Sequence, residues 1–158
     1  MHLTLALRNG MGLVAALVAT TAPAMPHIAQ DPTRVKVVAH EYAFESPDSA
    51  RAGLAAFEFE NKGAKDHEMI VGLLRRDVSA ADIVAAHQKG INLRQLHTAY
   101  LEGPITGLLY ALPGGRSPAT LIVPLAAGRD YLLLCQFRDS IGAQPHVLFG
   151  MFRILHVR

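Results

Sequence analysis

The amino-acid sequence predicts an all-β domain, and three observations carry this prediction. Turn signals separate short apolar runs from residue 34 onward, a pattern that is typical of β-sandwiches and barrels. Hydrophobic residues make up 51% of the 158 residues, a fraction far too high for a disordered chain. A single cysteine excludes both a disulfide-stapled fold and a zinc site built on paired cysteines. We therefore expect one β-rich domain over residues 34–158.

Six segments are expected as strands. Residues 54–60 alternate two phenylalanines with two glutamates, which indicates a strand with one buried face. The other expected strands are apolar runs at residues 34–39, 69–74, 119–123, 131–136 and 149–157. Residues 124–128 contain proline and glycine, and we expect them to link two of these strands as a hairpin.

Residues 77–118 interrupt the β pattern and are expected to form a partly helical insertion. Ser79 and Asp82 resemble a capping box at the start of a helix, and Gly90 supplies its end. A second short helix is expected at residues 93–101. His87 lies on the first helix and is expected to be an ordinary surface or capping residue.

The first 24 residues have the order of features found in secretory signal peptides. Arg8 precedes an apolar stretch, and residues 22–24 read Ala-Pro-Ala, a small-residue cleavage site. We therefore expect export to the periplasm or secretion, with residues 25–33 as a flexible segment before the domain. A retained anchor is the alternative, although no run reaches the roughly 18 apolar residues that a bilayer span needs.

The charge of the chain argues against some classes of binding partner. The formal net charge is only +2, and Lys and Arg form no cluster larger than Arg75-Arg76. Nucleic-acid binding is therefore not expected, because it depends on a basic patch. Once the signal peptide is removed, we expect neither an integral membrane protein nor an oligomer.

The C-terminal region carries the residues that favour metal chemistry. An apolar run ends at Cys135, and a polar loop then leads to His146 and Met151. A thiolate, an imidazole and a thioether in one strand–loop–strand unit are the donors that copper prefers. A copper site of this kind needs a second histidine ligand. His67, at the start of an apolar run, is the preferred candidate, and His40 is the alternative.

At these residues the sequence resembles the cupredoxins, the plastocyanin-like blue copper proteins. The resemblance lies in a cysteine that ends one strand, a histidine in the next loop and a methionine shortly after it. It implies a Greek-key β-sandwich that holds one copper ion. The implied ligands are His67, Cys135, His146 and, as a weak axial ligand, Met151.

Two further residues matter beside the implied ligands. Glu68 stands where the family often has an asparagine that ties two loops together, so we expect it to support or modify the site. Gly150 directly precedes Met151, as in the family pattern. The loop of ten residues between Cys135 and His146 is longer than in small blue copper proteins and is similar to that of copper nitrite reductases.

The resemblance implies a non-enzymatic electron carrier that serves a redox partner protein. A site saturated by four ligands leaves no open position for a substrate. The family pattern also implies that the edge of His146 lies near solvent, where residues 147–149 would form an apolar docking surface. Two alternatives stay open: a periplasmic copper carrier or chaperone, and a metal-free cupredoxin-like binding module in which Cys135 is only a buried hydrophobe.

Overall fold

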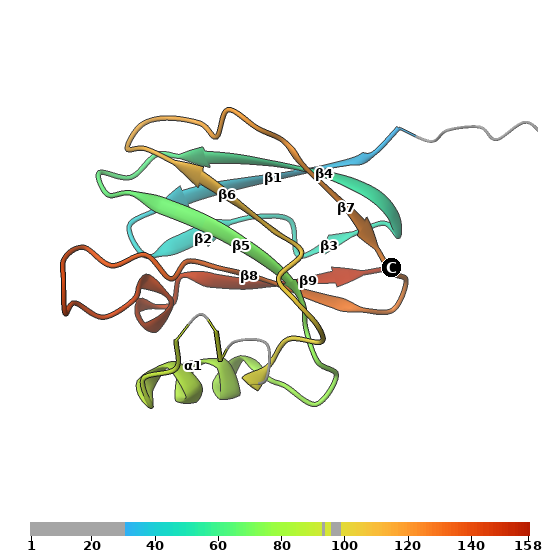
Figure 1. Cartoon of the computed structure of the whole chain (residues 1–158). Helices are drawn as coiled ribbons and strands as arrows, with labels where there is room; N and C mark the ends of the chain where they lie inside the picture. Colours follow the sequence, from blue (N-terminus) through green and yellow to red (C-terminus); the bar gives the residue numbers. More distant parts are fainter. Residues whose placement is uncertain (1–30, 93, 96–98) are drawn as a thin grey trace, which may run out of the picture.

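The computed structural model describes residues 31–92, 94–95 and 99–158. Two β-sheets face each other across a shared core, and one α-helix lies outside them (Figure 1). The all-β prediction is therefore confirmed. The expected signal peptide and most of the expected flexible segment lie outside the described residues.

The strands form a sandwich of four and five strands. The first sheet contains β1 (Thr33–His40), β2 (Ala43–Glu45), β4 (Gly53–Asn61) and β7 (Leu121–Leu125), in the order β2-β1-β4-β7. The second contains β3 (Ser49–Ala50), β5 (His67–Leu73), β6 (Gly107–Ala111), β8 (Asp130–Leu134) and β9 (Phe152–Val157), in the order β3-β9-β8-β5-β6. Each of the six expected strands overlaps an observed one.

Strand β4 buries alternate side chains, as its sequence predicts. Phe57 and Phe59 lie in the core between the sheets, and the two glutamates of the strand face outward. The pattern arises because successive side chains of a strand point to opposite faces. Strand β1 lies parallel beside β4, with Val35 opposite Phe57, so both strands contribute to the same apolar layer.

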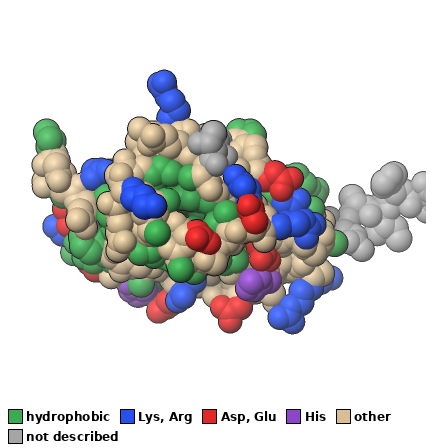
Figure 2. All heavy atoms as spheres, turned by 90° about the horizontal axis from the view of Figure 1, so that it is seen from below, with side chains coloured by type: hydrophobic (Ala, Val, Ile, Leu, Met, Phe, Trp, Pro, Cys, Tyr) green, Lys and Arg blue, Asp and Glu red, His purple; other side chains and the backbone are tan. Residues whose placement is uncertain are grey.

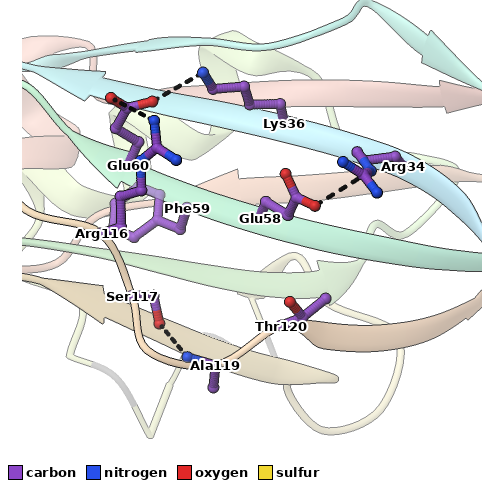
Figure 3. Close-up of a pocket in the computed structure, with 9 residues that line it drawn as sticks. All are labelled: Arg34, Lys36, Glu58, Phe59, Glu60, Arg116, Ser117, Ala119 and Thr120. Atoms are coloured by element: carbon purple, nitrogen blue, oxygen red, sulfur yellow. Dashed lines mark hydrogen bonds and ion pairs between the residues drawn. The ribbon is translucent and has the colours of Figure 1, made fainter.

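The outer face of the first sheet carries paired charges around a recess of about 340 Å³ (Figure 3). Arg34 lies 3.2 Å from Glu58, and Lys36 lies 2.8 Å from Glu60. Arg116 also reaches Glu60, at 3.5 Å. Water and salt screen surface pairs of this kind, so they add little to the stability of the fold. The cations of this recess are thus already paired with carboxylates.

The second sheet is covered on both faces, which explains the continuous apolar runs of β5 and β8. On its inner face, side chains such as Val71 and Leu133 join the core between the sheets. On its outer face, Ile70, Leu132 and Leu134 pack in a second cluster with Ile83 of the helix α1 (Ala80–Gln88). Strands buried on both sides read as unbroken hydrophobic stretches.

Helix α1 begins and ends where the sequence predicts. The Asp82 backbone N–H donates to the Ser79 hydroxyl, while the Asp82 carboxylate accepts from the Ser79 N–H at 2.8 Å. The helix ends before Gly90, whose φ of 82° is a left-handed conformation that glycine adopts without strain. The second expected helix, at residues 93–101, falls partly outside the described residues.

Two local expectations are wrong, and a third, the partly helical insertion, holds but is incomplete. Residues 124–128 do not close a hairpin: they connect β7 in the first sheet to β8 in the second. Strand β6 lies inside the expected insertion of residues 77–118 and pairs with β5. The last expected strand starts late, because residues 146–149 form the short 3₁₀ helix η1 (His146–Phe149) before the chain turns at Gly150.

The surface on the α1 side carries no field of a single charge. Lys and Arg side chains are interspersed there with Asp and Glu around an apolar area (Figure 2). Among the described helices, none has the length and apolar character that crossing a bilayer requires.

Candidate metal centre

Three segments bring potential metal ligands to one end of the sandwich, where β5 starts and β8 ends (Figure 1). His67 is the first residue of β5, Cys135 follows the last residue of β8, and His146 opens η1. The side chains of all three are completely buried. They form the one cluster of three or more metal-capable side chains found within the described part of the chain.

The three donor atoms are spaced as ligands of a single ion. The Nδ1 atoms of His67 and His146 are 3.2 Å apart. The Cys135 Sγ lies 3.9 Å from the first of these nitrogens and 3.5 Å from the second. Bonds of about 2.0–2.3 Å from nitrogen and sulfur to a transition metal would place such ligands roughly 3.3–3.8 Å apart. The cluster therefore suits one copper ion, whose preferred donors are thiolate and imidazole.

Burial keeps the thiol of Cys135 protonated when no metal is present. It raises the pKa of Cys135 to about 12, although backbone N–H groups of Glu68 and Phe137 oppose the shift. A bound cation would displace this proton, because the thiolate is the form that binds metals.

His67 is poised as a neutral ligand. Burial lowers its pKa, and the neighbouring His146 lowers it further. Its Nδ1 faces the other two donors, whereas its Nε2 is buried with no hydrogen-bond partner within the described residues. The competing histidine, His40, lies in the other sheet with its Nε2 3.3 Å from Glu45, outside the cluster.

Asn61 holds the turn that leads into His67, a role that the sequence reasoning missed. Its buried side-chain amide donates to the carbonyls of Lys65 and Ala111, at 2.7 and 3.0 Å. Its oxygen accepts from the Gly63 N–H at 2.9 Å. The Asn-Lys-Gly sequence at residues 61–63 marked a turn, but the partner carbonyl on β6 could not be read from it.

Met151 is joined to two residues of the cluster by backbone hydrogen bonds. Its carbonyl accepts from the Cys135 N–H at 3.1 Å, and its own N–H donates to the His146 carbonyl at 3.2 Å. The side chain is fully buried in the same core cluster as Cys135. Gly150 makes this turn possible, since its φ of 99° would strain any residue with a Cβ atom.

Glu68, the second residue of β5, is hydrogen-bonded to the segment that follows Cys135. Its carboxylate accepts from the Gln136 backbone N–H at 3.2 Å, and burial raises its pKa. Gln136 in turn contacts His87 through its side chain at 3.1 Å.

His87 is not a surface residue, so that expectation is wrong. It is buried, with its Nε2 3.0 Å from the Tyr100 hydroxyl and its Nδ1 2.9 Å from the Ile83 carbonyl. Its place on the inner face of α1 could have been inferred from its spacing of four residues from Ile83. This network links α1 and residue 100 to the segment that follows Cys135.

The edge of His146 does not reach solvent, so that part of the docking expectation is wrong. The Tyr42 ring packs edge-on against the His146 ring, with centroids 4.9 Å apart. The Asp139 carboxylate lies 3.2 Å from His146 Nε2 and also accepts from the Tyr42 hydroxyl at 2.6 Å. This hydroxyl holds the pKa of Asp139 below its usual range. Of the expected docking residues, Val147 is buried and Phe149 is exposed.

Comparisons with known proteins identify the type of fold. No protein-family model and no curated protein matches the chain. Among solved structures, reduced auracyanin from Roseiflexus castenholzii has a TM-score of 0.52 and 19% identity, over 82% of this chain and 99% of that one. Auracyanin A of Chloroflexus aurantiacus, a "blue" copper protein, has a TM-score of 0.48 and 22% identity, over 81% of this chain and 100% of that one. The first of these likenesses shows that the chain has the cupredoxin fold, as the sequence resemblance implied.

Proposed function

We propose that this chain is a non-enzymatic copper protein that carries one electron at a time. In this proposal His67, Cys135 and His146 would be the strong ligands of one copper ion, and the thioether of Met151 would add a weaker bond. The observation that carries the proposal is the spacing of three buried donor atoms, each 3.2–3.9 Å from the other two. The cupredoxin fold supports it, because that fold places the donors on adjacent strands and loops.

Backbone hydrogen bonds already hold the three donor residues in place without a bound ion. His67 is fixed in the β5–β6 ladder opposite Ala111. The His146 N–H donates to the Phe137 carbonyl at 2.9 Å, and the Val147 N–H donates to the Cys135 carbonyl at 2.8 Å. Bound copper would supply one-electron chemistry between its two common oxidation states. Because the protein cage is already formed, it has little to rearrange when the charge at its centre changes.

Complete burial of the three donors favours an electron carrier over a copper chaperone. A chaperone must release its metal to a partner, which requires ligands that a second protein can reach. Here the side chains of His67, Cys135 and His146 have no exposed surface. Glu68 and Gly150 are proposed to support the cage, the first by joining β5 to the segment after β8 and the second by turning the chain into Met151.

The proposal includes export and an external redox partner. The signal-peptide pattern of residues 1–24 supports a periplasmic or secreted location, and we propose that the mature protein is a monomer. Because His146 is covered, the partner would contact the Tyr42 ring, which packs on His146, and the exposed Phe149 ring, 4.7 Å from that of Tyr42.

Redox cycling separates the electron carrier from the alternatives. We expect the copper-loaded protein to be reduced and reoxidised repeatedly with its visible absorption restored each time, while a Cu(I) chelator removes little metal. Metal that passes to the chelator on reduction would instead indicate a copper chaperone. No stoichiometric copper uptake would leave only a metal-free binding module.

A further inference from the structure

Asp139 contacts one specific nitrogen of His146, and Tyr42 holds Asp139 in place. Asp139 Oδ1 lies 3.2 Å from His146 Nε2, and Asp139 Oδ2 accepts from the Tyr42 hydroxyl at 2.6 Å. Lys65 adds a cation 3.8 Å from the same carboxylate. A carboxylate is an acceptor only, so the nitrogen that faces it must be the one that carries the proton.

This contact decides which nitrogen of His146 is free to bind a metal. A neutral imidazole has one N–H and one lone pair. With the proton on Nε2, the lone pair lies on Nδ1, which faces Cys135 Sγ at 3.5 Å. Histidine ligands commonly donate their second ring N–H to a carboxylate, which fixes the tautomer and the ring orientation.

The other histidine has no such support. His67 Nε2 is buried without a hydrogen-bond partner in the described part of the chain. In the metal-free protein His146 Nδ1 lies 3.2 Å from His67 Nδ1 and 3.5 Å from the Cys135 thiol. With its own proton on Nε2, His146 can accept a hydrogen bond at Nδ1 from either neighbour. Any effect of removing Asp139 should therefore appear first at His146.

Tyr42 is itself held in an unusual conformation. Its φ of 57° lies in the left-handed region, which a bulky residue adopts only where the surroundings enforce it. The preceding Glu41 accepts from the backbone N–H groups of Ala64 and Lys65 and so ties this turn to the one before His67. The turn thereby places the Tyr42 hydroxyl on Asp139.

We propose that Asp139, itself oriented by Tyr42, is a positioning residue for His146. We also propose that Asp139 favours Cu(II) over Cu(I) at the site. The inference rests on the proposed copper function, but its structural half concerns the metal-free protein. The negative charge of Asp139 reaches the ion through one imidazole and stabilises Cu(II) more than Cu(I), so its removal should raise the reduction potential.

The test uses the full chain with three substitutions at residue 139. In the metal-free protein, ¹⁵N NMR should show His146 as a single Nε2–H tautomer in the wild type and in Asp139→Glu, but a mixture in Asp139→Ala. We expect Asp139→Ala to bind copper about 10–100-fold more weakly. Asp139→Asn keeps the shape and an acceptor oxygen, so it should keep the tautomer and raise the potential. A tenfold greater loss of affinity for Cu(II) than for Cu(I) corresponds to a rise of about 59 mV.

Asp130→Asn is the matched control. Asp130 also pairs with an imidazole, that of His156 at 2.8 Å, but it lies at the start of β8, whereas Cys135 follows the end of that strand. This variant should change neither the His146 tautomer nor the potential. A wild-type tautomer in Asp139→Ala, or an unchanged potential in Asp139→Asn, would overturn the inference. If no variant binds copper, the proposed function fails, while the tautomer measurement still decides the role of Asp139.

Discussion

Replacing Cys135 with serine is expected to abolish the visible absorption of the copper-loaded protein and to weaken copper binding more than a hundredfold. The thiolate is the only sulfur anion available in this chain, and thiolate-to-copper charge transfer is the source of the colour. A serine hydroxyl stays protonated under the same conditions and is a poor ligand. One ligand of a four-ligand site accounts for roughly 3 kcal/mol, which corresponds to more than a hundredfold in affinity.

The measurement is a copper titration followed by visible absorption and paramagnetic resonance. Val147→Thr is the control, because it also places a hydroxyl at a completely buried position close to the site in sequence. It should keep the colour, whereas Cys135→Ser should lose it. A coloured Cys135→Ser variant would remove Cys135 from the set of ligands.

Copper is expected to stabilise the folded protein by about 4 kcal/mol when free copper exceeds the dissociation constant a thousandfold. The donors lie at the start of β5, just after β8 and at the start of η1, and His67 is 68 residues from Cys135, so the unfolded chain does not hold them together. For a domain of this size the gain corresponds to a rise in melting temperature of about 10 °C.

Thermal unfolding with copper and with a chelator measures this gain. In Cys135→Ser the difference between the two conditions should largely disappear, since the site loses its strongest ligand. Equal melting temperatures of the wild type with and without copper would show that the folded state does not hold the ion.

The sequence was informative where the chemistry lies within a short stretch. Cys135, His146 and Met151 fall within 17 residues, and their order alone suggested a copper site. The alternation in β4 and the capping box of α1 were equally local. Choosing His67 over His40 needed the resemblance to a family, because both histidines adjoin apolar strands.

Contacts between distant segments could not be read in this way. Tyr42 and Asp139 are 97 residues apart, and nothing in either local sequence indicates that they meet over His146. The crossing from β7 to β8 looked like a hairpin because its turn residues suit either connection. Strand β6 is only five residues long and was hidden by the helical pattern before it. The spacing of His87 from Ile83 indicates a shared helix face, but the contacts of His87 with Tyr100 and Gln136 could not be read from the sequence.

The most direct test of this account is copper X-ray absorption of the wild-type protein loaded with one equivalent of copper. We expect the nearest shell of the ion to contain one sulfur and two imidazole nitrogens, in both the oxidised and the reduced protein. A shell of oxygens and nitrogens without sulfur, or one with a single imidazole, would contradict the claim that His67, Cys135 and His146 converge on one ion.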